Sequence, residues 1–389
     1  MKTRFIKSIL ALVILFLAVV VIIAFLGPQI IPRCKYTART PTMGRPHASG
    51  GDVSASQAEE DAEYAVVRTF YGTDRATENP SSINDRYGGD RGTPVLGICD
   101  VSVPRGHTIG EVERPNIWKL QFSEDPEKHV MIQALQEVDA SVFFSSMSSR
   151  LDENKAHRAL VYIHGFRVPF SDAARRTAQM AYDLQFDGAP IFFSWPSKGH
   201  LAAYTVDEAN NEWSSPHLSS FLKDVVRNST ATNIYLIAHS MGARCLVEAL
   251  ESLARDMPES VQVIREIILA APDIDAEVFK EQVLPAMSAY ANPITLYMSS
   301  NDKALAASKA VHGSPRAGDT SREIPVGSKI EPIDASNVDT SFLGHSYYAD
   351  ERTLLADIHG LIMLHNRPNL RFGLVAMDAS SGRCWKFKR

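Results

Sequence analysis

Short apolar runs alternate with segments of helical periodicity over most of the chain. The apolar runs occupy residues 159–166, 190–197, 233–240, 263–275 and 294–302, and helical patterns follow at 171–186, 213–228, 241–256 and 276–291. Strands that are apolar nearly throughout are typical of a parallel sheet whose two faces are covered by helices. The repeated strand–helix order therefore predicts an α/β fold with a doubly wound, mostly parallel sheet.

The segment before these units has a different pattern. Residues 62–135 contain the β-like runs YAVVRTFY, TPVLGICDVSVP and IWKLQF, separated by turns rich in Gly, Pro and Asp. A last helical pattern, RTLLADIHGLIMLH, occupies residues 352–365. We therefore expect one domain over residues 62–389, with an N-terminal β-rich extension.

The N-terminus carries the longest apolar run. Residues 9–26, ILALVILFLAVVVIIAFL, are 18 consecutive apolar residues that follow Lys2, Arg4 and Lys7. A helix of this length spans about 27 Å, close to the roughly 30 Å hydrocarbon core of a bilayer. The run exceeds the usual core of a cleaved signal peptide, and no A-x-A site follows it. We therefore expect a signal anchor with one transmembrane helix in residues 1–34, and a flexible linker in residues 35–61.

Composition and charge narrow the possible functions. The chain is 45% hydrophobic and 22% charged, as is usual for a globular protein, and its net charge of -5 argues against a nucleic-acid partner. The four cysteines form no C-x-x-C pair, so they are either free buried thiols or, outside the cytosol, include one bridge between Cys99 and Cys384. Because no phosphate-binding loop or His/Cys cluster is present, neither a metal nor an organic cofactor is expected.

The stretch IAHSMGAR places Ser240 between an apolar strand and a helical pattern. A nucleophilic serine is exposed by such a sharp turn, which usually reads G-x-S-x-G because only small residues fit two positions before and after it. Here those positions hold Ala238 and Gly242, and alanine adds a single methyl group. The alternative is that Ser240 is an ordinary helix N-cap.

A serine hydroxyl needs a base, and the base is usually oriented by a carboxylate. In α/β-hydrolases the order along the chain is Ser, acid, His, which Ser240, Asp302 and His345 follow. Asp302 comes after the second strand beyond the serine, where the acid is expected. Asp273, better explained as a cap of the following helix, is a rival acid, and His312 is a weaker rival base.

The remaining site candidates follow from the same geometry. Two backbone N–H groups stabilise the oxyanion, one after the nucleophile and one in an earlier strand–helix loop, which indicates Met241 and Phe166 of YIHGF. Trp195 follows a strand and, like Tyr347, is a candidate for the substrate pocket. For Trp195 a role as a packed aromatic residue fits equally well.

Five motifs in this order resemble a known bacterial group, the α/β-hydrolase family called domain of unknown function 900. They are YGTDR (71–75), LVYIHGF (160–166), FFSWPS (192–197), IAHSMGAR (237–244) and APDID (271–275). The resemblance covers about residues 62–370 and implies an α/β-hydrolase fold with an esterase- or lipase-like serine site. It implies no particular substrate.

These observations predict a serine hydrolase that cleaves carboxylic esters through an acyl-enzyme. A lipid ester is one candidate substrate, because the predicted anchor would place the enzyme at a membrane. Two alternatives stay open, an acyltransferase on the same fold and a catalytically idle, membrane-tethered binding module. The predicted location is the bacterial inner membrane, with the catalytic domain in the periplasm.

Overall fold

The computed structural model describes residues 63–115, 121, 123–153, 155–320, 329–338, 351–379 and 382–388. All of them belong to one compact unit, Glu60–Arg389. The predicted anchor and linker, most of the IWKLQF run, and residues 339–350 lie outside the described residues. Within the described ranges, no helix combines the length and the apolar character needed to cross a bilayer.

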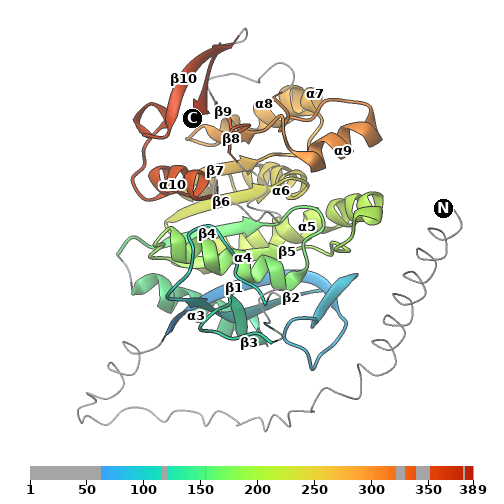
Figure 1. The fold of residues 1–389 in the computed structure, drawn as a ribbon, viewed down its shortest axis with the longest axis vertical. Coiled ribbons are helices and arrows are strands. Elements are labelled where there is room, and N and C mark those ends of the chain that lie inside the picture. The colour runs from blue at the N-terminus through green and yellow to red at the C-terminus, as the bar shows by residue number, and fades with distance from the viewer. Residues whose placement is uncertain are drawn as a thin grey trace, which may run out of the picture. The chain divides into compact units, whose positions relative to one another are not determined.

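The described strands form one eleven-stranded sheet (Figure 1). In chain order they are β1 (Tyr64–Thr77), β2 (Tyr87–Pro104), β3 (Met131–Val138), β4 (Arg158–Ile163), β5 (Ala189–Ser194), β6 (Asn233–His239), β7 (Ile264–Ala270), β8 (Ile294–Met298), β9 (Ile330–Asp334), β10 (Leu374–Ala379) and β11 (Gly382–Phe387). Their spatial order is β10-β11-β9-β8-β7-β6-β4-β5-β1-β2-β3. The strands from β11 to β1 pair in parallel, and β10, β2 and β3 add antiparallel edges.

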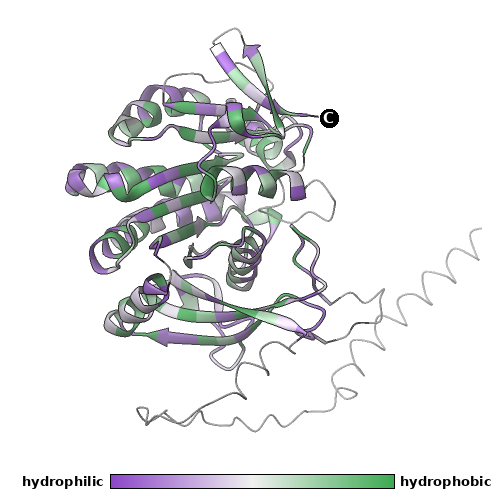
Figure 2. Ribbon diagram, turned by 90° about the vertical axis from the view of Figure 1, so that its left-hand side faces the viewer, coloured by the Kyte–Doolittle hydropathy of each residue, from purple (hydrophilic) through white to green (hydrophobic). Residues whose placement is uncertain are grey.

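Helices cover both faces of this sheet, as Figures 1 and 2 show. They are α3 (Ala140–Asp152), α4 (Phe170–Asp183), α5 (Tyr204–Asn228), α6 (Gly242–Asp256), α7 (Ala276–Val278), α8 (Leu284–Ala286), α9 (Lys303–His312) and α10 (Glu351–Ile362). Buried side chains of α3, α5 and α6 pack on one face, and those of α4 and α10 on the other. The central strands β4, β5 and β6 are buried almost throughout, which explains their continuous apolar sequence. The sequence thus predicts the doubly wound, mostly parallel sheet correctly.

One expectation is wrong, and one of the two alternatives for the cysteines is excluded. The single helix expected over residues 276–291 is broken into α7, a π-helical turn at Phe279–Val283, α8, and a 3-10 turn at Met287–Ala289, and Pro285 contributes because it lacks a backbone N–H. Cys99 and Cys384 are free and buried. They belong to β2 and β11, eight strand spacings apart, so roughly 38 Å separates them, far beyond the reach of a disulfide.

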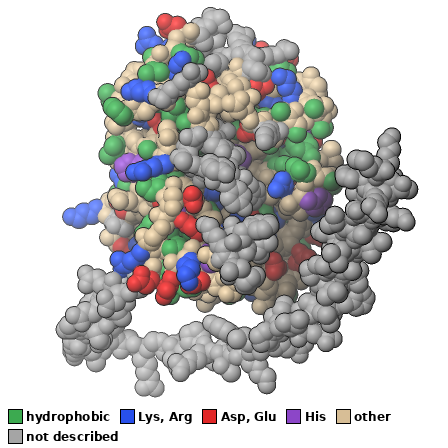
Figure 3. Space-filling view, in the orientation of Figure 1, with side chains coloured by type: hydrophobic (Ala, Val, Ile, Leu, Met, Phe, Trp, Pro, Cys, Tyr) green, Lys and Arg blue, Asp and Glu red, His purple; other side chains and the backbone are tan. Residues whose placement is uncertain are grey.

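The parallel strands bring their carboxyl ends to one edge of the sheet, where ligands bind in doubly wound folds. His164, Ser194, Ser240 and Asp302 follow or end β4, β5, β6 and β8 at this edge. Basic and acidic side chains are interspersed over the face of the molecule shown in Figure 3, rather than separated by sign. This fold therefore gathers the candidate catalytic side chains at the carboxyl edge of the sheet.

Candidate active site

Ser240 lies in a left-handed turn between β6 and α6. Its φ is 50°, a conformation that costs a non-glycine residue about 1–3 kcal/mol and that clusters at functional sites. A capping serine instead has an extended backbone and bonds the helix through its hydroxyl. The N-cap of α6 is Met241, and no side-chain hydrogen bond caps this helix. The backbone therefore excludes the capping role and has the form of a nucleophile elbow.

The turn admits only small side chains at its flanks. A Cβ on Gly242 would lie 2.2 Å from the carbonyl oxygen of His164, so this position requires glycine. Ala238 is fully buried and in register with Ile163 on β4 and Leu269 on β7. The sheet therefore accommodates the methyl group that replaces the usual first glycine.

The loop after β4 lies directly against Ser240. A Cβ on Gly165 would lie 3.0 Å from the Cβ of Ser240. The next residue, Phe166, is half-buried, with its ring centroid 5.2 Å from that of Tyr204. The two segments that carry the expected oxyanion donors, Met241 and Phe166, therefore meet at the serine.

A buried network beneath this loop fixes the orientation of His164. Its Nδ1 is 2.9 Å from the carbonyl oxygen of Gly165, which can only accept, so Nδ1 carries the proton. Its Nε2 therefore accepts from Arg75 Nη2 at 3.2 Å and from Ser194 Oγ at 3.1 Å. Burial and the charge of Arg75 hold the pKa of His164 well below its usual value, so the imidazole is neutral and supports the loop.

Arg75 is buried and donates only to uncharged groups. Its Nε donates to Ser194 Oγ at 2.8 Å, and its Nη2 donates to Val168 O at 2.7 Å as well as to His164. Nη1 donates to Gly88 O at 2.8 Å and to Ser197 O at 3.0 Å. Burial lowers the pKa of Arg75 to about 10, which leaves the guanidinium charged at neutral pH. This single side chain ties the loop after β4 to β5 and to the N-terminal extension.

Asp273 forms a second buried junction. Its Oδ2 accepts from Tyr204 Oη at 2.5 Å and lies 3.2 Å from Arg244 Nη2. Its Oδ1 accepts from Ser308 Oγ at 2.5 Å and lies 3.2 Å from Arg316 Nε. Because donors occupy both carboxylate oxygens, the geometry disfavours Asp273 as the acid that orients a catalytic histidine.

The junction at Asp273 also holds the elbow. The N–H of Asp273 donates to the carbonyl oxygen of Ser240 at 3.2 Å, and Arg244 Nε donates to the carbonyl oxygen of Asp273. The helix that follows is capped by Asp275, whose Oδ1 accepts from the N–H of Glu277 at 2.9 Å. The expectation that Asp273 is that cap is therefore wrong.

The structure places the other acid, Asp302, after β8 at the start of α9. Its Oδ1 accepts from the N–H groups of Ala304 at 2.8 Å and Leu305 at 3.0 Å. His345 and Tyr347 lie outside the described residues. Ser240 and Asp302 thus share the carboxyl edge of the sheet, with β7 between their strands.

Two further candidates have defined partners. Trp195 has no exposed surface, donates through Nε1 to the carbonyl oxygen of His164 at 2.8 Å, and stacks on that ring, as its alternative role in packing requires. His312 Nε2 lies 2.8 Å from Glu208 Oε1, and its Nδ1 donates to the carbonyl oxygen of Ser308 at 2.9 Å. Among the described residues, no group of three His, Cys, Asp or Glu is arranged to hold a metal ion.

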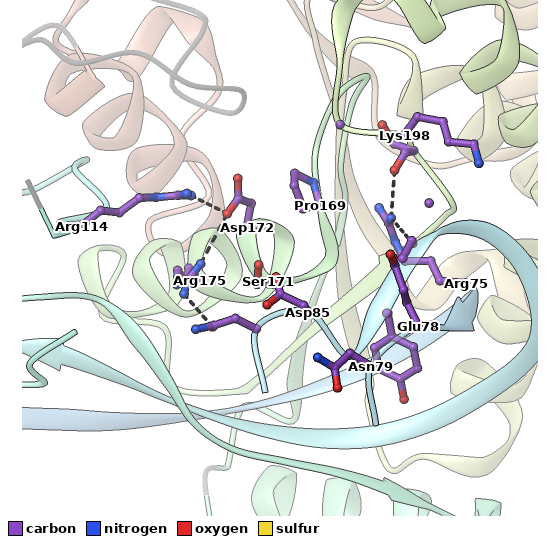
Figure 4. A pocket seen from close by; sticks show the side chains of 16 residues that line it. Arg75, Glu78, Asn79, Asp85, Arg114, Pro169, Ser171, Asp172, Arg175 and Lys198 are labelled. Atoms are coloured by element: carbon purple, nitrogen blue, oxygen red, sulfur yellow. Dashed lines mark hydrogen bonds and ion pairs between the residues drawn. The ribbon is translucent and has the colours of Figure 1, made fainter. Parts of the chain in front are cut away.

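A polar cavity of about 590 Å³ opens beside the loop after β4. Figure 4 shows Arg114, Asp172 and Arg175 on its α4 side, and Arg75 and Lys198 across from them. Arg114 Nη2 is 2.6 Å from Asp172 Oδ1, while the Nε of Arg175 has no hydrogen-bond partner among the described residues. Arg75 is the physical link between this cavity and the loop that contacts Ser240.

Sequence reasoning assigned no role to Arg75 or Arg244, although both stand inside motifs that it singled out. Their positions are the sequence feature that could have indicated a buried role. Arg75 lies near the end of a strand, and Arg244 lies in the first turn of a helix. Such an arginine must find acceptors when it is buried. Its partners, however, come from distant segments and cannot be read from local pattern.

The fold and the elbow define an α/β-hydrolase. The chain belongs to the family described as alpha/beta hydrolase of unknown function, or domain of unknown function 900, whose model matches residues 140–366. The YGTDR motif that contains Arg75 precedes the matched segment.

Other comparisons give more distant similarity. An uncharacterized protein of Nostoc sp. (strain PCC 7120) is 33% identical over 77 residues, which are 20% of each chain. A protein assigned as a cell surface hydrolase from Lactobacillus plantarum is 11% identical, with a TM-score of 0.33, over 56% of this chain and 95% of that one. A CIB-like hydrolase from Thermoplasma acidophilum is 17% identical, with a TM-score of 0.31, over 60% and 93%. Both TM-scores lie below 0.5, so the family match alone establishes the class of protein.

Proposed function

We propose that this hydrolase cleaves carboxylic esters through a Ser-His-Asp triad. Ser240 attacks the acyl carbon while His345 takes the hydroxyl proton and Asp302 orients the imidazole. The backbone N–H groups of Met241 and Phe166 stabilise the oxyanion of the tetrahedral intermediate. The protonated histidine then gives its proton to the leaving alcohol, and water releases the acyl group from the serine.

The observation that carries this proposal is the backbone of Ser240. A left-handed φ at a serine persists only where the surroundings impose it, and here Gly165, Gly242 and Asp273 confine the turn. The N-terminus of α6 starts beside the same serine, so its free N–H groups and dipole favour developing negative charge.

A fluorophosphonate probe tests the nucleophile directly, because it forms a covalent adduct only with an activated serine. We expect labelling of the full chain that is lost in Ser240→Ala and His345→Ala. Ser220→Ala, which removes an exposed hydroxyl on α5, serves as the control and keeps full labelling. Labelling that survives in Ser240→Ala would show that another residue is the nucleophile.

The same preparation separates the alternatives. Hydrolysis of p-nitrophenyl esters in water supports the esterase. An acyltransferase is supported if the serine is labelled and the acyl group is released faster after an alcohol or amine acceptor is added than in water alone. Absence of both labelling and turnover in the folded chain supports a binding module.

We further propose that the polar cavity beside the loop after β4 receives the polar part of the substrate. Its support is that Arg114 and the half-buried Lys198, which are paired with Asp172 and Asp90, line a cavity large enough for a small molecule. Arg114→Ala and Lys198→Ala should raise KM for esters with an anionic group and leave neutral esters unchanged. Arg68→Ala, an exposed arginine on β1 paired with Asp100, is the matched control; equal effects on both ester types would refute the role.

The membrane anchor in residues 1–34 and a periplasmic catalytic domain are also proposals. Their support is the apolar run at residues 9–26 and the basic residues before it. A C-terminal alkaline phosphatase fusion should be active in bacterial cells, because this reporter folds only after export. Activity of a cytoplasmic reporter at the same position, without phosphatase activity, would reverse the orientation.

A further inference from the structure

Three strongly exposed apolar side chains lie in the segment that follows α10. Leu364 is 59%, Leu370 71% and Phe372 90% exposed. They line one groove of about 440 Å³ together with residues of α10, and we call these three side chains the α10 patch. Phe372 and Leu370 are the two most exposed large apolar side chains of the described residues. Single exposed apolar residues are ordinary, but a contiguous group of this kind marks an interaction surface.

The exposed charges around the α10 patch are cationic. Lys388 Nζ lies 4.4 Å from the centroid of the Phe372 ring and donates to its carbonyl oxygen at 2.5 Å. Arg352 is exposed and lines the same groove. The carboxylate in this lining, Asp357, is buried and bonded to Arg371 Nη1 at 2.8 Å.

The C-terminal segment of the chain is rich in basic residues. Residues 366–389 contain six Lys or Arg residues and one Asp, in a chain whose net charge is -5. Arg367 and Arg371 are compensated by buried carboxylates on β7, β9 and α10. Of the remaining cations, Arg383 and Lys386 have Asp378 and Asp334 as register partners on the neighbouring strands. The positive charge next to the α10 patch therefore comes from Lys388 and Arg352.

We propose that the α10 patch docks on the surface of an anionic bilayer, with Phe372 and Leu370 inserted at the headgroup level. An apolar group bordered by cations, with its carboxylate buried, matches a negatively charged lipid interface. The proposal rests on the proposed N-terminal anchor, which supplies the bilayer. The sequence predicts a linker over residues 35–61; a random-coil chain of that length would have a root-mean-square length of roughly 30 Å. Such a tether would make a weak contact effective by keeping it close to the membrane.

The test uses the full chain reconstituted in lipid vesicles, with Cys34→Ser to remove the one cysteine that is not buried in the described fold. Phe372→Cys carries an environment-sensitive nitrobenzoxadiazole label, and Val66→Cys is the matched control because Val66 is exposed on β1, toward the opposite edge of the sheet. In phosphatidylglycerol vesicles we expect a blue shift and quenching by spin-labelled lipids at position 372 alone. Phosphatidylcholine vesicles or 0.5 M NaCl should weaken both signals, because the attraction is electrostatic.

Each result decides between proposals. If the chain floats with vesicles while the label at 372 stays solvated, the docking proposal is wrong and the anchor stands. If the chain does not float, the anchor proposal fails. A blue shift at 372 that appears in detergent, with a dimer in light scattering, assigns the patch to a second copy and overturns bilayer docking. Leu370→Ser/Lys388→Ser should reduce the signal at 372 at least about tenfold without changing the rate on a soluble ester.

Discussion

Replacing Gly242 by alanine tests how tightly the elbow is built. The added Cβ would lie 2.2 Å from the carbonyl oxygen of His164 and 3.0 Å from that of Ile163. Since a carbon–oxygen contact normally needs about 3.3 Å, the start of α6 or the end of β4 must move by about 1 Å. Both contacts are with backbone, so no side chain can rotate away. Crowding of this kind costs about 1–3 kcal/mol of stability.

The same displacement acts on catalysis. The end of β4 leads into the loop that contacts Ser240, and a 1 Å misplacement of reacting groups can cost about 100-fold in rate. We therefore expect Gly242→Ala to lower the free energy of unfolding, measured by urea denaturation, and to lower kcat/KM on a p-nitrophenyl ester by about 100-fold.

A matched glycine supplies the control for this experiment. A Cβ on Gly106 would meet no atom within 4 Å, so Gly106→Ala should keep full activity and gain about 0.4–1 kcal/mol from the reduced entropy of the unfolded chain. If Gly242→Ala matches Gly106→Ala in both measurements, the requirement for glycine after the serine is refuted.

Three other substitutions probe the supporting network. Asp273→Asn removes the ion-pair partner of the buried Arg316, while Arg244 keeps its pair with Glu208, and should cost about 3–5 kcal/mol in urea denaturation. Asp302→Asn should keep its cap and stability but lower kcat by orders of magnitude, and the reverse pattern would exchange the roles of the two aspartates. Burial opposes the protonation of His107, but hydrogen bonds to Asp183 and Glu113 outweigh it and raise the pKa of His107 to about 9. The stabilisation from the charged imidazole is therefore complete below pH 6.5 and declines as the pH rises through 9. The difference in Tm between wild type and His107→Gln should shrink from pH 7 to 10, and a constant difference would contradict the charged pair. Arg75→Lys offers three donors for five acceptors, so the free energy of unfolding should fall by about 1–3 kcal/mol for each buried carbonyl left unpaired. The Tm of this variant should be lower than that of Arg68→Lys, and equal Tm values would contradict the buried network.

The parts of the site that follow local rules can be predicted from the sequence. The turn at Ser240 follows from an apolar strand, a helical pattern and two small flanking residues, all within IAHSMGAR. The placement of Asp302 follows from its position after β8. Each depends on neighbours in the chain, so periodicity and residue size are sufficient.

The parts of the site and fold that depend on contacts between distant segments cannot be predicted from local sequence pattern. Asp273 is predicted to be a cap because it precedes a helix. Its carboxylate instead accepts from Tyr204 on α5 and Ser308 on α9, and pairs with Arg316 in the segment after α9. The strand β9 (Ile330–Asp334) is not among the strands expected from the sequence, because it is recognisable only through its pairing with β8. A Pro inside that short run hides the strand from local pattern, although the pairing register includes Pro332.

The position of Arg75 has a consequence for where the chain can be cut. The segment matched by the family begins at residue 140, but the donor that satisfies His164 Nε2, Val168 O and Ser197 O comes from β1. A chain expressed from residue 140 would also leave β5 as an open edge, because β1 is its parallel neighbour, and unpaired edges promote aggregation. An expression boundary set before Tyr64, rather than at the start of the family match, preserves the unit that holds the serine in place.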